Sequence, residues 1–213
     1  MLKLSIILSA LFISLSFISC QKEISADLLS SKEQLPDDPL TAPDSSIQGN
    51  YKFLYMTVSS NAANEASSGD EVDKTVTVSQ YTTINNAGTI KFDANTMSSS
   101  NLAYDINTIA KGYIYANGTL IDSVDTPLQY SAPVSSSRIS YRMVGSDSLY
   151  CSSGSMFLSN TTQATNPIGV KLQVGGNKLY MTMRQNQSTT QNVQGVNIVY
   201  TSTLVATVAL ERL

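Results

Sequence analysis

Apolar and polar residues alternate along most of the chain after residue 46, which is the pattern of strands that bury one face. In the segment GTIKFDA, residues 88 to 94, Ile90 and Phe92 alternate with polar neighbours. The segments 74–84, 101–122 and 138–145 keep the same period of two. None of these segments has the three-to-four-residue spacing of an amphipathic helix. The pattern therefore predicts strands as the main element.

Turn residues separate these segments at short intervals. Asn117-Gly118 is a strong hairpin signal, and Gly175-Gly176-Asn177 separates two alternating runs that share one apolar face. The last segment, residues 196 to 213, is long enough to span a barrel wall or to bend between two sheets. About eight to ten strands at such spacing predict an antiparallel barrel or sandwich.

The first 19 residues follow a different pattern. Lys3 gives a positive start, residues 4 to 18 are apolar with small polar interruptions, and Ser19 precedes Cys20. This is the pattern of a secretory signal peptide, and it is shorter than the ~20 apolar residues of a membrane span. We therefore predict a signal peptide over residues 1–19, with an uncleaved membrane anchor as the alternative.

The end of this segment, Phe17-Ile18-Ser19-Cys20, resembles the bacterial lipobox. It departs from the common form, which has Leu in place of Phe17 and Gly or Ala in place of Ser19. The resemblance implies cleavage before Cys20 and acylation of its thiol. Each buried methylene of the acyl chains would contribute ~0.8 kcal/mol to anchorage. A free or buried cysteine is the alternative.

Residues 20–45 contain three prolines and no sustained apolar period, which predicts a flexible tether after the lipidated cysteine. Two basic and six acidic side chains give this segment a net charge of −4. Gln21-Lys22-Glu23 resembles the start of a surface-export signal of Gram-negative lipoproteins. The expected location is therefore the outer membrane, with the cell surface favoured over the periplasmic face.

The remaining domain, residues 46–213, begins with IQGNYKF and ends with ERL. The opening resembles the Gly-x-Trp start of lipocalin-like domains, with Tyr51 in place of Trp, and Arg212 resembles the arginine that covers this ring. The resemblance implies an antiparallel lipocalin-like β-barrel in which Tyr51 and Arg212 meet at the closed end. An unrelated β-sandwich with the same strand count is the alternative.

Composition argues against an enzyme. The chain has no histidine, which excludes Ser-His and Cys-His nucleophile pairs and the commonest metal ligand. Cys151 is the one cysteine besides Cys20, and we interpret it as a small buried side chain. Residues 46–213 carry ten basic and ten acidic side chains, so they offer no basic field for nucleic acid. We expect no enzyme activity, metal or cofactor.

Two functions fit an anchored β-domain best, and a hydrolase that uses carboxylates ranks last. The first is capture of a small apolar or amphipathic ligand inside the barrel. The second is an interaction lipoprotein with a filled core that docks an envelope protein or glycan. Tyrosine suits both functions, and it is also an ordinary strand residue. The candidate residues lining the ligand site are Tyr55, Tyr104, Tyr141, Met143, Met181 and Met183.

Overall fold

The computed structural model describes residues 47–151 and 167–213. The predicted signal peptide, the lipidated cysteine and the tether lie outside these residues. The described chain forms one antiparallel sheet of nine strands, which confirms the predicted all-β fold. The strands are β1 (Gly49–Ser68), β2 (Glu71–Thr82), β3 (Ile84–Phe92), β4 (Thr96–Ala116), β5 (Thr119–Val144), β6 (Ser148–Cys151), β7 (Ile168–Gly175), β8 (Lys178–Val193) and β9 (Val196–Arg212).

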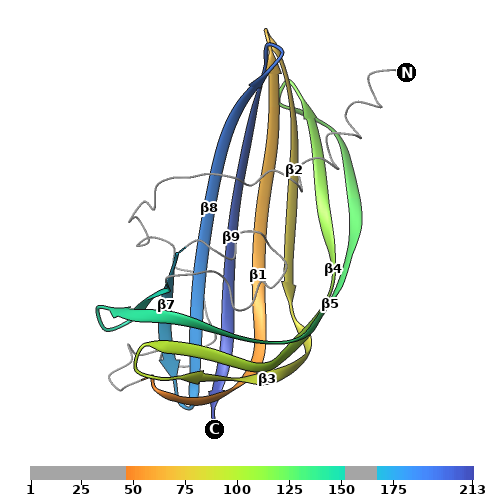
Figure 1. Cartoon of the computed structure of the whole chain (residues 1–213). Helices are drawn as coiled ribbons and strands as arrows, with labels where there is room; N and C mark the ends of the chain where they lie inside the picture. The colour runs from red at the N-terminus through yellow and green to blue at the C-terminus, as the bar shows by residue number, and fades with distance from the viewer. Residues whose placement is uncertain (1–46, 152–166) are drawn as a thin grey trace.

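At one end of the molecule the sheet closes into a ring. The beginning of β1 pairs with β3 on one side and with the end of β9 on the other. The order β1-β3-β4-β5-β6-β7-β8-β9 returns to β1, so eight strands enclose this end. The first strand therefore lies beside the last, as barrel closure requires. We call this end the closed half; it lies at the bottom of Figure 1.

The other end of the molecule is an open curved sheet. Here β2 inserts between β1 and β4, and the strand order is β5-β4-β2-β1-β9-β8. Among the described residues, β5 and β8 form the two margins of this sheet and no strand joins them. We call this part the open half. Figure 1 shows its long strands rising above the closed half.

Irregular positions bend the strands around the closed half. Pairing between β3 and β4 shifts register twice, and pairing between β1 and β9 shifts between Phe53 and Tyr55. Gly88 lies at one shift with φ of +107°, and a Cβ there would meet the backbone oxygen of Asn101 at 2.7 Å. Only glycine fits this crossing without moving a backbone.

The hydrophobic core fills the closed half. The rings of Tyr51, Phe92 and Tyr141 meet edge to face, with centroids 5.5 and 5.9 Å apart. Burying each large apolar side chain contributes about 1.5–3 kcal/mol, so this cluster is the main source of stability. The largest fully buried side chains are Phe53, Phe92, Met56, Ile90, Met97, Leu149, Leu172, Leu179, Met181, Leu210 and Val208.

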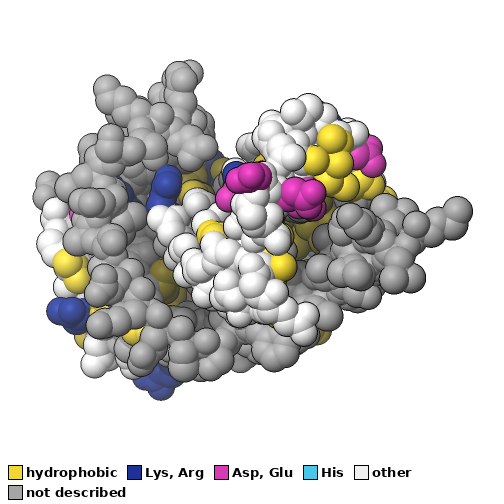
Figure 2. Space-filling view, turned by 90° about the horizontal axis from the view of Figure 1, so that it is seen from above, with side chains coloured by type: hydrophobic (Ala, Val, Ile, Leu, Met, Phe, Trp, Pro, Cys, Tyr) yellow, Lys and Arg dark blue, Asp and Glu magenta, His cyan; other side chains and the backbone are white. Residues whose placement is uncertain are grey.

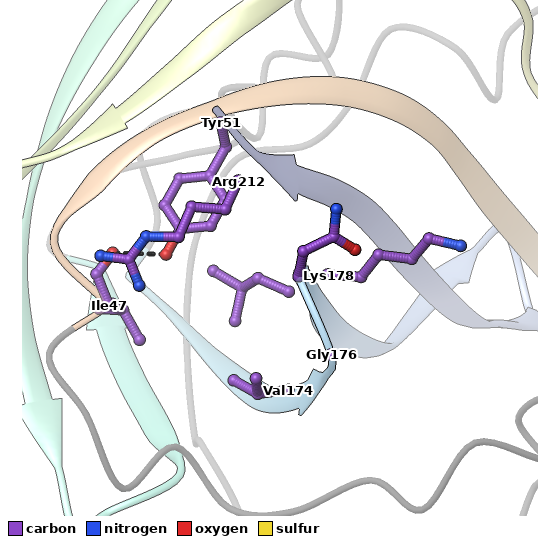
Figure 3. A pocket seen from close by; sticks show the side chains of 8 residues that line it. Ile47, Tyr51, Val174, Gly176, Lys178 and Arg212 are labelled. Carbon is purple, nitrogen blue, oxygen red and sulfur yellow. Dashed lines mark hydrogen bonds between the residues drawn. The ribbon is translucent and has the colours of Figure 1, made fainter.

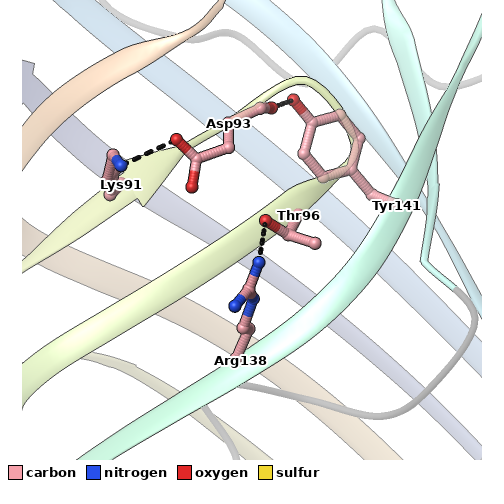
Figure 4. Close-up of polar contacts among 5 residues, drawn as sticks. All are labelled: Lys91, Asp93, Thr96, Arg138 and Tyr141. Carbon is pink, nitrogen blue, oxygen red and sulfur yellow. Dashed lines mark hydrogen bonds and ion pairs between the residues drawn. The ribbon is translucent and has the colours of Figure 1, made fainter.

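Polar contacts hold the β3–β4 turn against β5 (Figure 4). The Tyr141 hydroxyl donates a hydrogen bond of 2.6 Å to the carbonyl of Asp93, and Arg138 donates one of 3.2 Å to the Thr96 hydroxyl. Lys91 and the Asp93 carboxylate form an ion pair of 2.8 Å. The buried ring of Tyr141 therefore keeps a satisfied hydroxyl at the edge of the core.

Apolar and polar residues alternate along the strands with the predicted period of two. The apolar side of a strand, however, is not always the side that faces the interior. Leu102, Tyr104 and Ile106 share the inner side and are buried, as expected. Val76 and Val78 also share a side, but it is the outer one, because Val58 pairs with Tyr81 and Asn61 with Val78. Neither face of the sheet is fully buried in the open half. The positions of the apolar residues there therefore do not show which side of a strand faces inward.

Candidate functional site

Four of the six predicted ligand-lining residues lie inside the closed half. Tyr104, Tyr141, Met181 and Met183 are 5, 6, 0 and 4% exposed and belong to the hydrophobic core. Burial raises the pKa of the Tyr104 hydroxyl to about 12. These side chains belong to the buried cluster that fills the space they were expected to line. They are core residues.

The other two lie elsewhere, which corrects the predicted site. Tyr55 pairs with Ala209 on the outer side, because the register shift after Phe53 reverses its parity relative to Tyr51. Met143 pairs with Leu149 near the end of β5 and is 42% exposed. The sequence shows the period of two, but it does not show the extra residue that turns Tyr55 outward.

The closed end contains a small pocket of about 40 Å³. Tyr51 and Arg212 lie at this pocket (Figure 3), and the two residues oppose each other across β1 and β9. The Tyr51 hydroxyl donates to the carbonyl of Ile47 at 2.9 Å, and Arg212 donates to the carbonyl of Gln48 at 3.0 Å. Ligand sites usually measure ~300 Å³ or more, so this pocket is too small to be a ligand site. The residues that line it close the end of the barrel.

Burial raises the pKa of the Tyr51 hydroxyl, while the charge of Arg212 acts in the opposite direction. The aromatic neighbour of Tyr51 is Phe92. Arg212 contacts the segment before β1 through a hydrogen bond to the carbonyl of Gln48, and within the described residues it makes no cation–π contact with the Tyr51 ring. The two residues therefore tie the beginning and the end of the domain together.

The open half presents an inner face, meaning the side that continues the barrel interior. Register places Ala62 and Asn64 of β1 on this face, since they follow Val58 with the same parity. Opposite them lie Thr77 and Thr75 of β2. Across the other edge of β1 the partners are Ser202 and Tyr200 of β9. Small, hydroxyl and amide side chains therefore form the middle of the inner face.

Apolar side chains flank this polar middle. Val124 of β5 opposes Gly112 of β4 and is 51% exposed. A Cβ at Gly112 would meet the Val124 side chain at 2.9 Å, so the glycine provides space for the valine. Toward the closed half, Tyr81, Leu128 and Leu204 are partly buried against the core. The inner face thus has an apolar floor and a polar middle, which makes it our candidate binding surface.

Charge is distributed unequally over the open half. Glu71, Asp73 and Asp122 lie on the inner face near the tips of the strands. The basic residues Lys74, Lys111 and Arg184 lie on the outer face, where Lys74 pairs with Glu65 at 3.4 Å. Figure 2, which looks down on the molecule, shows acidic and hydrophobic side chains together on one part of the surface. The inner face therefore has acidic ends and no described basic group.

Groups that support catalysis are sparse in the described part. No cluster of three or more Cys, Asp and Glu side chains there is arranged to hold a metal ion. Asp122 and Asp125 lie on opposite faces of β5, opposite Ile114 and Lys111. Burial raises the pKa of the Cys151 thiol to about 11, which keeps it protonated at neutral pH. The thiol is therefore a packing group.

The fold and surface thus define an all-β protein with a filled closed half and an open sheet. Within residues 47–151 and 167–213, no helix has the length and apolar character needed to cross a membrane. No family model matches the chain, and no curated protein or solved structure matches it.

Proposed function

We propose that this protein is a non-enzymatic binding lipoprotein of the outer envelope, and that it docks an envelope partner on the inner face of its open half. One observation carries the proposal: side chains fill the closed half, while the inner face of the open half is accessible. Capture of a small ligand inside the barrel, the first of our two hypotheses, gives way to docking because the expected lining residues are core residues.

The chemistry of the inner face supports a neutral, hydroxyl-rich partner such as a glycan. Thr75, Thr77 and Ser202 supply hydroxyl groups that both donate and accept hydrogen bonds. Tyr200 adds an aromatic ring that could pack against the apolar surface of a partner while its hydroxyl stays hydrated. The acidic ends of the face repel polyanions such as phosphorylated lipids or acidic polymers. An envelope protein with a neutral or basic surface is the alternative partner.

The anchor belongs to the same proposal. The apolar residues 1–19 and the Phe17-Ile18-Ser19-Cys20 resemblance support export and lipidation at Cys20. The acidic segment 20–45 would hold the domain away from the membrane surface. A lipocalin-like origin is supported by the ring of eight strands and by the opposed pair Tyr51 and Arg212. We favour the cell surface over the periplasmic face.

Two adjacent alanines of β1 provide a matched test. Ala62 lies on the inner face and Ala63 on the outer face, and both are half-buried. We expect Ala62→Arg to weaken binding to neutral glycans isolated from the envelope by at least about tenfold, because the long cation blocks the middle of the face. Ala63→Arg should bind as the wild type does. Binding is measured with the full-length lipidated protein.

A photoreactive residue tests the partner's position independently. Placed at Ser202 it faces inward, and placed at Thr203 it faces outward. Cross-linking to an envelope partner from the inner position alone supports the proposal. Equal loss of binding in both arginine variants would contradict it. Binding of one apolar probe molecule per chain, unaffected by Ala62→Arg, would favour ligand capture instead.

A further inference from the structure

Three exposed basic side chains surround the point where the chain enters the domain. The described chain begins at Ile47, which is buried and lines the small pocket together with Lys178 and Arg212 (Figure 3). Lys52 lies near them, because Lys52 and Lys178 both pair with Glu211, one from each side of β9. We call Lys52, Lys178 and Arg212 the basic rim; all three are exposed at the closed end.

The charges of the basic rim lack ion-pair partners in the described part of the chain. None of the ion pairs found there includes a residue of the rim. Glu211 lies between the two lysines, but its carboxylate accepts a hydrogen bond of 3.0 Å from the Asn177 side chain. Arg212 donates to the carbonyl of Gln48, which uses one of the five N–H groups of a guanidinium. The rim is therefore a group of exposed cations that suits an anionic partner.

The segment that leads into the domain is acidic. Residues 37–46 carry three aspartates and no basic side chain, and they lie outside the described residues. Asp44 is three positions before Ile47 and therefore at most ~11 Å from it along the chain. Its carboxylate thus stays near the rim whatever path the backbone takes, at a distance comparable to the ~8 Å Debye length of physiological salt. Chain connectivity and charge complementarity both indicate this segment as the partner of the rim.

We propose that residues 37–46 dock on the basic rim, with Asp44 beside Lys178 and the other two aspartates toward Lys52. The two lysines are two strand spacings apart, ~10 Å, which the segment is long enough to follow. Exposed ion pairs are individually weak, but a segment of the same chain has a high effective concentration at the rim. Its two prolines restrict the backbone, which reduces the entropy lost on docking.

Docking would determine how the domain is presented. The closed half and the tips of the open half lie at opposite ends of the molecule (Figure 1). With residues 37–46 held at the rim, the rest of the tether leaves from the closed end toward Cys20. The closed half would then face the membrane, and the inner face of the open half would project away from it. This orientation rests on the proposed anchor at Cys20, whereas the docking itself does not depend on the anchor or on the partner of the inner face.

A spin label on the segment tests the docking. Thr41→Cys places one reactive thiol in the segment, because the Cys151 thiol is 1% exposed and Cys20 is acylated under our proposal. The maleimide-labelled full-length protein is studied in a neutral detergent, and the wild-type chain treated in the same way gives the background. We expect restricted motion of the label at low salt and release at about 1 M salt, where the Debye length falls to ~3 Å.

A charge exchange provides the second arm. Asp44→Lys replaces an attraction with a repulsion, so the equilibrium constant for docking should fall roughly tenfold. Adding Lys178→Glu should restore docking, whereas adding Lys111→Glu on the outer face of the open half should not. Circular dichroism checks that each variant is folded. A label that is mobile at every salt concentration, equal effects of the two added substitutions, or restriction that requires anionic lipid vesicles would overturn the proposal.

Discussion

At the scale of single residues, Tyr51 and Arg212 hold the ends of the domain together. Their partners are neighbouring carbonyls, those of Ile47 and Gln48, so both side chains fix the same short segment before β1. Gly49 precedes Tyr51 with φ of +148°, and a Cβ there would lie in van der Waals contact with the Arg212 guanidinium, 3.4 Å away. Because both side chains fix the same segment, we expect their contributions to the free energy of unfolding to be coupled. A comparison of single and double variants can measure this coupling.

We expect Tyr51→Ala to reduce the free energy of unfolding by about 3–5 kcal/mol through a cavity in the core, and Arg212→Ala by about 1 kcal/mol. The double variant should lose less than the sum, because each side chain fixes the segment that the other one needs. Denaturant unfolding measures all three. The control is Lys178→Ala, which lies at the same pocket and should add to Tyr51→Ala. Full additivity of Tyr51 and Arg212 would show that they act separately.

At the scale of strands, the crossing of β3 and β4 depends on Gly88. Alanine at that position would combine a φ of +107° with a Cβ 2.7 Å from backbone atoms of Asn101 and Leu102. We expect Gly88→Ala to reduce the free energy of unfolding by about 3 kcal/mol or more, since a backbone must move. Gly176→Ala is the matched control, with φ of +59° and open space, and should cost about 1 kcal/mol. Thermal unfolding that shows equal losses would mean the crossing has no steric requirement.

The strands and hairpins were predictable because alternation and turn residues are local signals. Asn117-Gly118 and Gly176-Asn177 form the expected turns between β4 and β5 and between β7 and β8. The orientation of Tyr55 was not predictable, because a single register shift reverses parity without changing the pattern around it. The insertion of β2 between β1 and β4 was not predictable either, since a period of two does not specify strand neighbours.

The candidate binding surface was missed for a related reason. The sequence suggested an interior lined by large side chains such as Met181 and Tyr104, and these became the core. The accessible inner face instead carries small and polar residues such as Ala62 and Thr77. On an exposed strand such residues are unremarkable, and only the three-dimensional register places them together. Long-range pairing therefore determines the surface that composition alone could not locate.

At the scale of the whole molecule, the proposed lipid anchor at Cys20 would determine where the candidate binding surface acts. We expect Cys20→Ser to abolish lipid labelling and membrane retention, because the acylated thiol is lost, while the β-domain still folds. Labelled palmitate and membrane fractionation measure the first two effects, and circular dichroism of the released protein measures the third. Labelled lipid on the Ser variant would contradict lipidation at Cys20. Protease added to intact cells distinguishes surface display from the periplasmic face.

The seam between β1 and β9 also constrains when the protein can fold. Arg212 donates to the carbonyl of Gln48, and these residues are 164 positions apart in the chain. In a chain that is exported from its N-terminus, β1 leaves the translocon first, yet its partner β9 leaves last. Such distant pairing is slow, because the loop entropy is lost before the contacts form. Until the last strand arrives, β1 would expose an open edge to which a strand of another chain could add.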